Sequence, residues 1–176
     1  VLMITQSLSM VDIVNAQAKC WFVILQPLAF VIYAISAIAE TNRCPFDLPE
    51  AETELVAGFH TEYSSMKFAL FFMAEYANMM TSSAVIVTLF FGGYLVPFQS
   101  LLIDAVPSLE GSAWLTLMQI GSLVLKSAFF AYLFIWVRWT LPRFKYNQLM
   151  TLGWKWLLPL ALANIMITAA IALATY

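Results

Sequence analysis

Four long apolar windows constrain the fold of this chain more than any other feature. They cover residues 19–39, 66–91, 113–137 and 154–175. A helix of about 20 apolar residues is needed to cross the ~30 Å hydrocarbon core of a bilayer. Inside that core every backbone N–H and C=O needs a protein partner, and an α-helix supplies these partners within its own segment. The windows therefore predict an all-α integral membrane protein with four transmembrane helices.

The composition agrees with a membrane location. The chain is 62% hydrophobic and 10% charged, whereas a soluble domain carries roughly 25% charged residues. Residues 1–12 resemble the end of an earlier helix. We expect residues 1–176 to form a single membrane domain. Pro27 interrupts the first window, which membrane helices tolerate when neighbours satisfy the carbonyl that proline leaves free. The net charge of −2 gives no reason to expect nucleic-acid binding.

Basic residues gather on one side of the predicted bundle. Six of the eight lie in or beside the loops that follow the first and third windows: Arg43, Lys67, Arg138, Arg143, Lys145 and Lys155. The loop over 92–112 has none. Because Lys and Arg are retained on the cytoplasmic side, we expect the loop over 40–65 to face the cytoplasm, or the matrix of a mitochondrion.

That loop also concentrates the acidic residues. Six of the ten lie between positions 40 and 62: Glu40, Asp47, Glu50, Glu52, Glu54 and Glu62. Asp47-Leu48-Pro49-Glu50 has the pattern of a capping box that opens a short helix. The capping box does not explain Glu52 and Glu54, and Glu50 repels Glu54 because the two share a helix face. In a pocket of low dielectric this repulsion favours keeping one of them protonated, so we expect proton exchange here.

Four further charged residues invite functional readings. Glu40 ends the first window, where an acid opposes the helix dipole, and this favours a paired or proton-active role. Arg43 either forms a salt bridge with a neighbouring Glu or acts as a fixed cation beside a carbonyl ligand. Glu75 and Lys126 lie inside predicted helices, where each charge costs at least ~2.5–3.5 kcal/mol. Lys126 either relays protons or pairs with an acid on another helix, for instance Glu75.

The residues for a metal site are lacking. The chain has two cysteines, Cys20 and Cys44, and one histidine, His60. No CxxC or HxxxH spacing occurs, so we expect neither a metal ion nor an iron–sulfur cluster to be bound by this chain alone.

Two segments carry a resemblance to a known family. Residues 40–76 read ETNRCPFDLPEAETELVAGFHTEYSSMKFALFFMAEY, and residues 137–159 read VRWTLPRFKYNQLMTLGWKWLLP. Together with SLSMVDIVNAQ near the start, they resemble the quinone-cavity membrane subunit of respiratory complex I, the proton-pumping NADH:quinone oxidoreductase. The resemblance runs the full chain and covers the C-terminal half of the family.

The resemblance implies roles for the acidic loop. In the family this loop lines the quinone cavity, where the membrane and peripheral arms meet. Arg43, Phe46 and Asp47 would border the quinone route. The path that couples quinone reduction to proton translocation would use Glu40, Glu50, Glu52, Glu54, Glu75 and Lys126. No catalytic residue is expected in this chain alone.

The resemblance also implies a substrate, partners and a location. The substrate would be a quinone (ubiquinone, menaquinone or plastoquinone), and no cofactor would be ligated by this chain. Its partners would be the other membrane-arm subunits, the iron–sulfur and quinone-site peripheral subunits, and the lipid bilayer. The location would be a bacterial cytoplasmic membrane or the mitochondrial inner membrane.

Three other functions compete with this one. The first is the homologous subunit of a membrane-bound hydrogenase or ferredoxin-linked complex, which uses no quinone; the intact ETNR and PFDLPEAE motifs favour the quinone-reducing branch. The second is an ion-coupled secondary transporter, for which we expect inverted repeats and find none in the sequence. The third is a purely structural assembly subunit.

Overall fold

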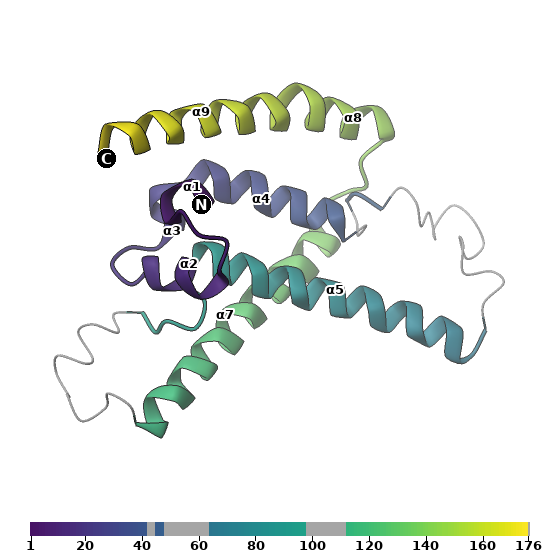
Figure 1. The fold of residues 1–176 in the computed structure, drawn as a ribbon. Coiled ribbons are helices and arrows are strands. Elements are labelled where there is room, and N and C mark those ends of the chain that lie inside the picture. Colours follow the sequence, from purple (N-terminus) through teal and green to yellow (C-terminus); the bar gives the residue numbers. More distant parts are fainter. Residues whose placement is uncertain (42–44, 48–63, 98–111, 176) are drawn as a thin grey trace.

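The regular elements in the described part of the chain are all helices. The computed structural model describes residues 1–41, 45–47, 64–97 and 112–175. In chain order the helices are α1 (Leu2–Thr5), α2 (Met10–Ala16), α3 (Phe22–Leu25), α4 (Pro27–Glu40), α5 (Met66–Phe90), α7 (Ala113–Thr140), α8 (Tyr146–Met150), the π-helix η3 (Thr151–Leu157) and α9 (Leu158–Thr175). The expected all-α fold class is confirmed for these residues (Figure 1).

Among the described residues, three continuous helices are long and apolar enough to cross a membrane. They are α5, α7 and the run Tyr146–Leu173, in which α8, η3 and α9 follow one another without a break. The windows predicted at 66–91, 113–137 and 154–175 fall on these three helices. The short helix expected in the acidic loop lies outside the described residues.

The first window does not form one continuous helix. It is divided into α3 and α4, and Gln26 between them has φ −135° and ψ 64°. Proline disfavours helical geometry in the residue before it, yet it is well suited to the first position of a helix, which Pro27 occupies in α4. With 14 residues, α4 rises about 21 Å at 1.5 Å per residue, which is short of a full crossing.

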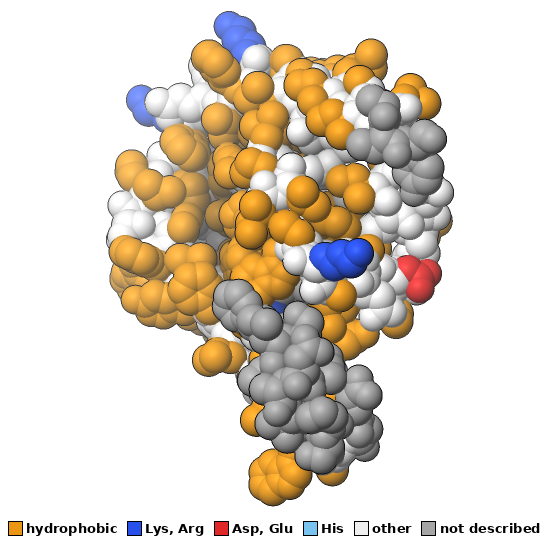
Figure 2. Space-filling view, turned by 90° about the vertical axis from the view of Figure 1, so that its left-hand side faces the viewer, with side chains coloured by type: hydrophobic (Ala, Val, Ile, Leu, Met, Phe, Trp, Pro, Cys, Tyr) orange, Lys and Arg blue, Asp and Glu red, His pale blue; other side chains and the backbone are white. Residues whose placement is uncertain are grey.

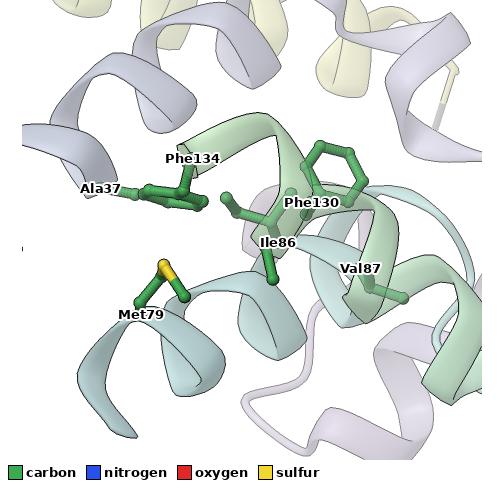
Figure 3. Close-up of a cluster of buried hydrophobic side chains, with 7 residues drawn as sticks. Ala37, Met79, Ile86, Val87, Phe130 and Phe134 are labelled. Carbon is green, nitrogen blue, oxygen red and sulfur yellow. The ribbon is translucent and has the colours of Figure 1, made fainter. Parts of the chain in front are cut away.

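The helices pack around the point where α5 and α7 cross. α4 contacts both α5 and α9, and α1 and α2 contact α9 and α5 respectively (Figure 1). The main core cluster joins α4, α5 and α7 and is shown in Figure 3: Ala37, Met79, Ile86, Val87, Phe130, Ala131 and Phe134. A second cluster of Ile13, Phe22 and Phe90 attaches the N-terminal helices to the end of α5. These clusters use only the C-terminal half of α5.

The exterior remains strongly apolar. Hydrophobic side chains cover much of the face drawn in Figure 2. In α9, for example, Leu162, Met166 and Leu173 are 57%, 72% and 82% exposed. So much exposed apolar surface is rare on a soluble monomer and matches a surface that meets lipid or other membrane helices.

Candidate functional site

The segment after α4 is held against the segment after α7. The N–H of Phe144 donates to the carbonyl of Pro45 at 3.0 Å, and the rings of Phe46 and Phe144 lie 5.5 Å apart. Phe46 is only 7% exposed. Oδ1 of Asp47 and Nη1 of Arg143 are also buried. Phe46 and Asp47, two of the residues predicted to border a quinone cavity, thus lie where α4 and α7 end.

Three charged residues each lie one helical turn from a residue of the apolar core, on the side of this same end. Ala37, Met79 and Phe134 belong to the main cluster and come from α4, α5 and α7. Residues three or four apart share a helix face, and one turn beyond these three lie Glu40, Glu75 and Arg138. In each helix that turn points toward the acidic-loop end. Glu40 is exposed, whereas Glu75 and Arg138 are half-buried. We call Glu40, Glu75 and Arg138 the charged layer.

Lys126 occupies a different place, on the other side of the apolar core. Its Nζ donates to three backbone carbonyls: Phe91 at 2.9 Å, Gly93 at 3.2 Å and Leu95 at 2.7 Å. The centroid of the Trp21 ring lies 5.1 Å from the same nitrogen. An ammonium has three N–H donors, so these carbonyls match its full capacity. We call the three carbonyls and the indole ring the Lys126 cage.

The cage bears on one sequence-based interpretation of Lys126, its pairing with Glu75; its role as a proton relay stays a prediction. Glu75 lies sixteen residues before Phe91 in the same run of chain, which corresponds to about 24 Å along the axis of α5. Lys126 therefore does not pair with Glu75, and carbonyl dipoles surround its ammonium group instead. Glu75 belongs to the charged layer, and Lys126 belongs to the opposite end of the core.

A buried glutamine side chain forms hydrogen bonds to the backbone next to the Lys126 cage. Gln17, 1% exposed, donates through Nε2 to the carbonyls of Ile13 at 3.2 Å and Thr88 at 3.0 Å. Its Oε1 accepts from the N–H of Gly92 at 2.9 Å and of Phe22 at 3.4 Å. One side chain thus connects the end of α2, the start of α3 and the end of α5.

A cavity of about 620 Å³ lies between α1, α2, α4, α9 and the end of α5. Apolar side chains such as Ile32, Phe90 and Ile165 form most of its wall. Gln26 and Thr168 add polar groups, and the Nε2 of Gln26 donates to the Oγ1 of Thr168 at 3.2 Å. The cavity is separate from both the charged layer and the Lys126 cage.

The remaining predicted site residues, Arg43, Glu50, Glu52 and Glu54, lie outside the described residues. Within the described part of the chain, no three His, Cys, Asp or Glu side chains gather in a way that would hold a metal ion.

Sequence reasoning missed several residues that organise these sites. Gln17, Trp21 and Phe144 were not singled out, because a glutamine in an apolar run and single aromatic residues carry no motif. Arg138 was used only to orient the chain in the membrane. Its spacing of four residues from Phe134 becomes informative only when the partners of Phe134 are known.

Comparisons with known proteins agree with one another. A family profile described as NADH dehydrogenase matches residues 1–169. The chain is 60% identical to NADH-quinone oxidoreductase subunit 8 of Rhodothermus marinus, over 93% of this chain and 49% of that protein. It is 57% identical to a subunit of the NADH-quinone oxidoreductase of Salinibacter ruber, over 96% of this chain and 50% of that protein. The chain thus spans about half the length of the curated relatives it matches.

Proposed function

The chain belongs to the NADH dehydrogenase family, and from this premise we propose that it is a membrane subunit of a proton-pumping NADH:quinone oxidoreductase. Its relatives are named as subunits of NADH-quinone oxidoreductase. Within this chain, Phe46 and Asp47 would border the cavity that receives the quinone head, together with Arg43. The apolar exterior and the three long apolar helices of the described residues support a location in a membrane.

The contacts that hold residues 45–47 in place support the proposed quinone cavity. Phe46 packs on Phe144, and the backbone of Pro45 is tied to Phe144. A buried aromatic ring and a carboxylate with a buried oxygen therefore stand next to each other at one end of the bundle. Apolar walls with a few fixed polar groups are the usual lining of a site for a small organic ligand.

The observation that carries the proton-coupling part is the charged layer. Glu40 and Glu75 each lie one helical turn from a member of one apolar cluster, and Arg138 has the same spacing from a third member. When a quinone beside this layer gains electrons, it attracts protons, and the field of the reduced quinone favours protonation of nearby carboxylates. We assign Glu40 and Glu75 to the path that passes this change into the membrane. Glu50, Glu52, Glu54 and Lys126 are proposed as further members of that path.

The proposed partners and orientation follow from the same assignment. Electrons would reach the quinone from iron–sulfur and quinone-site peripheral subunits, and the other membrane-arm subunits would move the protons. The acidic loop would face the cytoplasm of a bacterium or the mitochondrial matrix, because basic residues concentrate on that side of the chain.

Carboxylate-to-amide variants in the assembled complex test the proposal. Glu75→Gln and Glu40→Gln keep the shape of the side chain but cannot exchange a proton. We expect the rate of proton pumping to fall by about tenfold or more in Glu75→Gln, since a positioned acid–base group typically contributes roughly 10²–10⁴-fold to a rate. The matched control is Asp12→Asn, because Asp12 is exposed in α2 and accepts from the Ser7 hydroxyl at 2.6 Å, away from the charged layer.

The result that contradicts the proton-path assignment is unchanged pumping and unchanged quinone reduction in both glutamine variants. The substrate is tested separately, by adding quinone to the purified wild-type complex with NADH. Absence of electron transfer to quinone, with electron exchange to ferredoxin instead, would favour the hydrogenase-type alternative.

A further inference from the structure

After α5, four backbone N–H groups have partners within the chain, and three carbonyls accept from Lys126. The N–H groups of Phe91 and Gly93 both donate to the carbonyl of Val87, and the N–H of Leu95 donates to the carbonyl of Gly92. The N–H of Gly92 is taken by Gln17. The carbonyls of Phe91, Gly93 and Leu95 all turn toward one nitrogen, Nζ of Lys126.

Two consecutive glycines allow this convergence. Gly92 and Gly93 have φ of +71° and +51°, a left-handed geometry that residues with a Cβ adopt only at a cost. The resulting turn aims carbonyls 91, 93 and 95 at α7 instead of continuing the helix. Irregular backbone at membrane depth is tolerated only where the protein satisfies its polar groups, and here one side chain satisfies three of them.

We infer that Lys126 is the positioning residue of segment 91–97, and that the number of protons on its nitrogen sets how firmly this segment is held. The second half rests on the proposed function, which puts Lys126 on the proton path. A charged ammonium offers three N–H donors to three carbonyls. If the nitrogen gives up one proton to the path, it keeps two donors and gains a lone pair, which repels the third carbonyl.

The contact to Gly93 is the first to be lost when a proton leaves the nitrogen. It is the longest of the three at 3.2 Å, against 2.9 Å to Phe91 and 2.7 Å to Leu95, and Leu95 has a second donor in the Ser122 hydroxyl at 3.3 Å. Loss of this contact frees the glycine turn, so a change of charge becomes a change of backbone position at the end of α5.

Other titratable groups occur on the elements packed near Lys126, and Asp12, Cys20 and Tyr94 form hydrogen bonds of their own. On α2, Asp12 accepts from Ser7. Before α3, Lys19 precedes Cys20, whose Sγ donates to the carbonyl of Trp21. Within segment 91–97, the hydroxyl of Tyr94 donates to Asn15. Asp104 and Glu110, which follow the segment in sequence, lie outside the described residues. Nζ of Lys126 itself contacts the three carbonyls and the indole ring.

Hydrogen–deuterium exchange of the amides in segment 91–97 tests the inference in the protein purified from its membrane with its co-purifying subunits. Lys126→Met keeps an unbranched side chain and removes every donor. We expect the protection of these amides to fall by about tenfold or more, equivalent to about 1.4 kcal/mol. Lys126→Gln keeps two donors on a shorter chain and should give an intermediate loss. Lys155→Met makes the same substitution at an exposed residue of η3 and should leave the segment unchanged.

A pH profile distinguishes contacts of Lys126 that depend on its protonation from contacts that do not. Exchange rates are divided by those of an unstructured peptide at the same pH. We expect wild-type protection of segment 91–97 to fall as pH rises, because the amine loses a donor. Lys126→Arg should restore protection relative to Lys126→Met and show no such fall, because a guanidinium stays protonated.

Different results would overturn the positioning role of Lys126 and its dependence on protons. Protection that is unchanged in both Lys126→Met and Lys126→Gln, or lowered equally in Lys155→Met, overturns the positioning role. A wild-type profile as flat as that of Lys126→Arg overturns the dependence on protons. Exchange is measured without turnover, so these results do not depend on whether Glu40 and Glu75 affect quinone reduction or pumping.

Discussion

Gly93 offers the sharpest test of the packing at the end of α5. Its φ is +51°, and a Cβ added there would lie 2.8 Å from Cγ2 of Val14, a side chain only 2% exposed. An L-residue in left-handed geometry costs roughly 1–2 kcal/mol, and an overpacked site typically costs about 1–3 kcal/mol more. We therefore expect Gly93→Ala to lower the free energy of unfolding by about 2–5 kcal/mol.

Gly121→Ala is the matched control, because it adds the same methyl group at a site with open space. Gly121 lies within α7, and nothing stands within 4 Å of its added Cβ. Alanine is favoured over glycine in a helix by up to about 1 kcal/mol, so this variant should be unchanged or slightly more stable. Reversible unfolding by SDS in bicelles, followed by tryptophan fluorescence, measures both changes. Equal stabilities for Gly93→Ala and Gly121→Ala would refute the reasoning.

Two further predictions concern buried polar contacts. Gln17→Ala leaves the N–H groups of Phe22 and Gly92 without their partner. At about 1–3 kcal/mol per group, it should destabilise the protein by about 2–6 kcal/mol in the same SDS titration. A change below about 0.5 kcal/mol would show that water or a neighbour replaces the amide. The bond from Gln26 to Thr168 at 3.2 Å ties α4 to α9, so a double-mutant cycle of Gln26→Leu with Thr168→Val should give a coupling near ~0.6 kcal/mol, the average for membrane helices. Strict additivity of the two changes would mean that the bond contributes nothing.

The helices were predictable from sequence because their cause is local. Apolar length predicted the helices now seen as α5, α7 and α8–η3–α9, since backbone satisfaction in a bilayer permits few alternatives. The split of the first window was signalled by Pro27, yet its consequence was underestimated. Whether a proline kinks a helix or divides it depends on the neighbours that satisfy the freed groups, and these are unknown before the chain has folded.

The candidate sites were predictable only residue by residue. The cost of a charge in an apolar run marked Glu75 and Lys126 as functional candidates, and the family resemblance supplied Phe46 and Asp47. Their grouping was not predictable. Glu75 shares a layer with Glu40 and Arg138, whereas Lys126 binds the carbonyls after α5. The roles assigned to Arg43, Glu50, Glu52 and Glu54 stay predictions.

The amino-acid sequence alone determined the membrane class, the helical secondary structure and the family, because hydropathy and motif are properties of short stretches of chain. Only the tertiary structure decided which helices bring their charged turns to the same end of the core and what surrounds the ammonium of Lys126. The register between helices fixes those pairings, and it is set by how side chains such as Met79 and Phe134 interlock. Lys126 illustrates the difference: its charge is visible in the sequence, but its partners are backbone carbonyls, which every residue possesses and no sequence pattern marks.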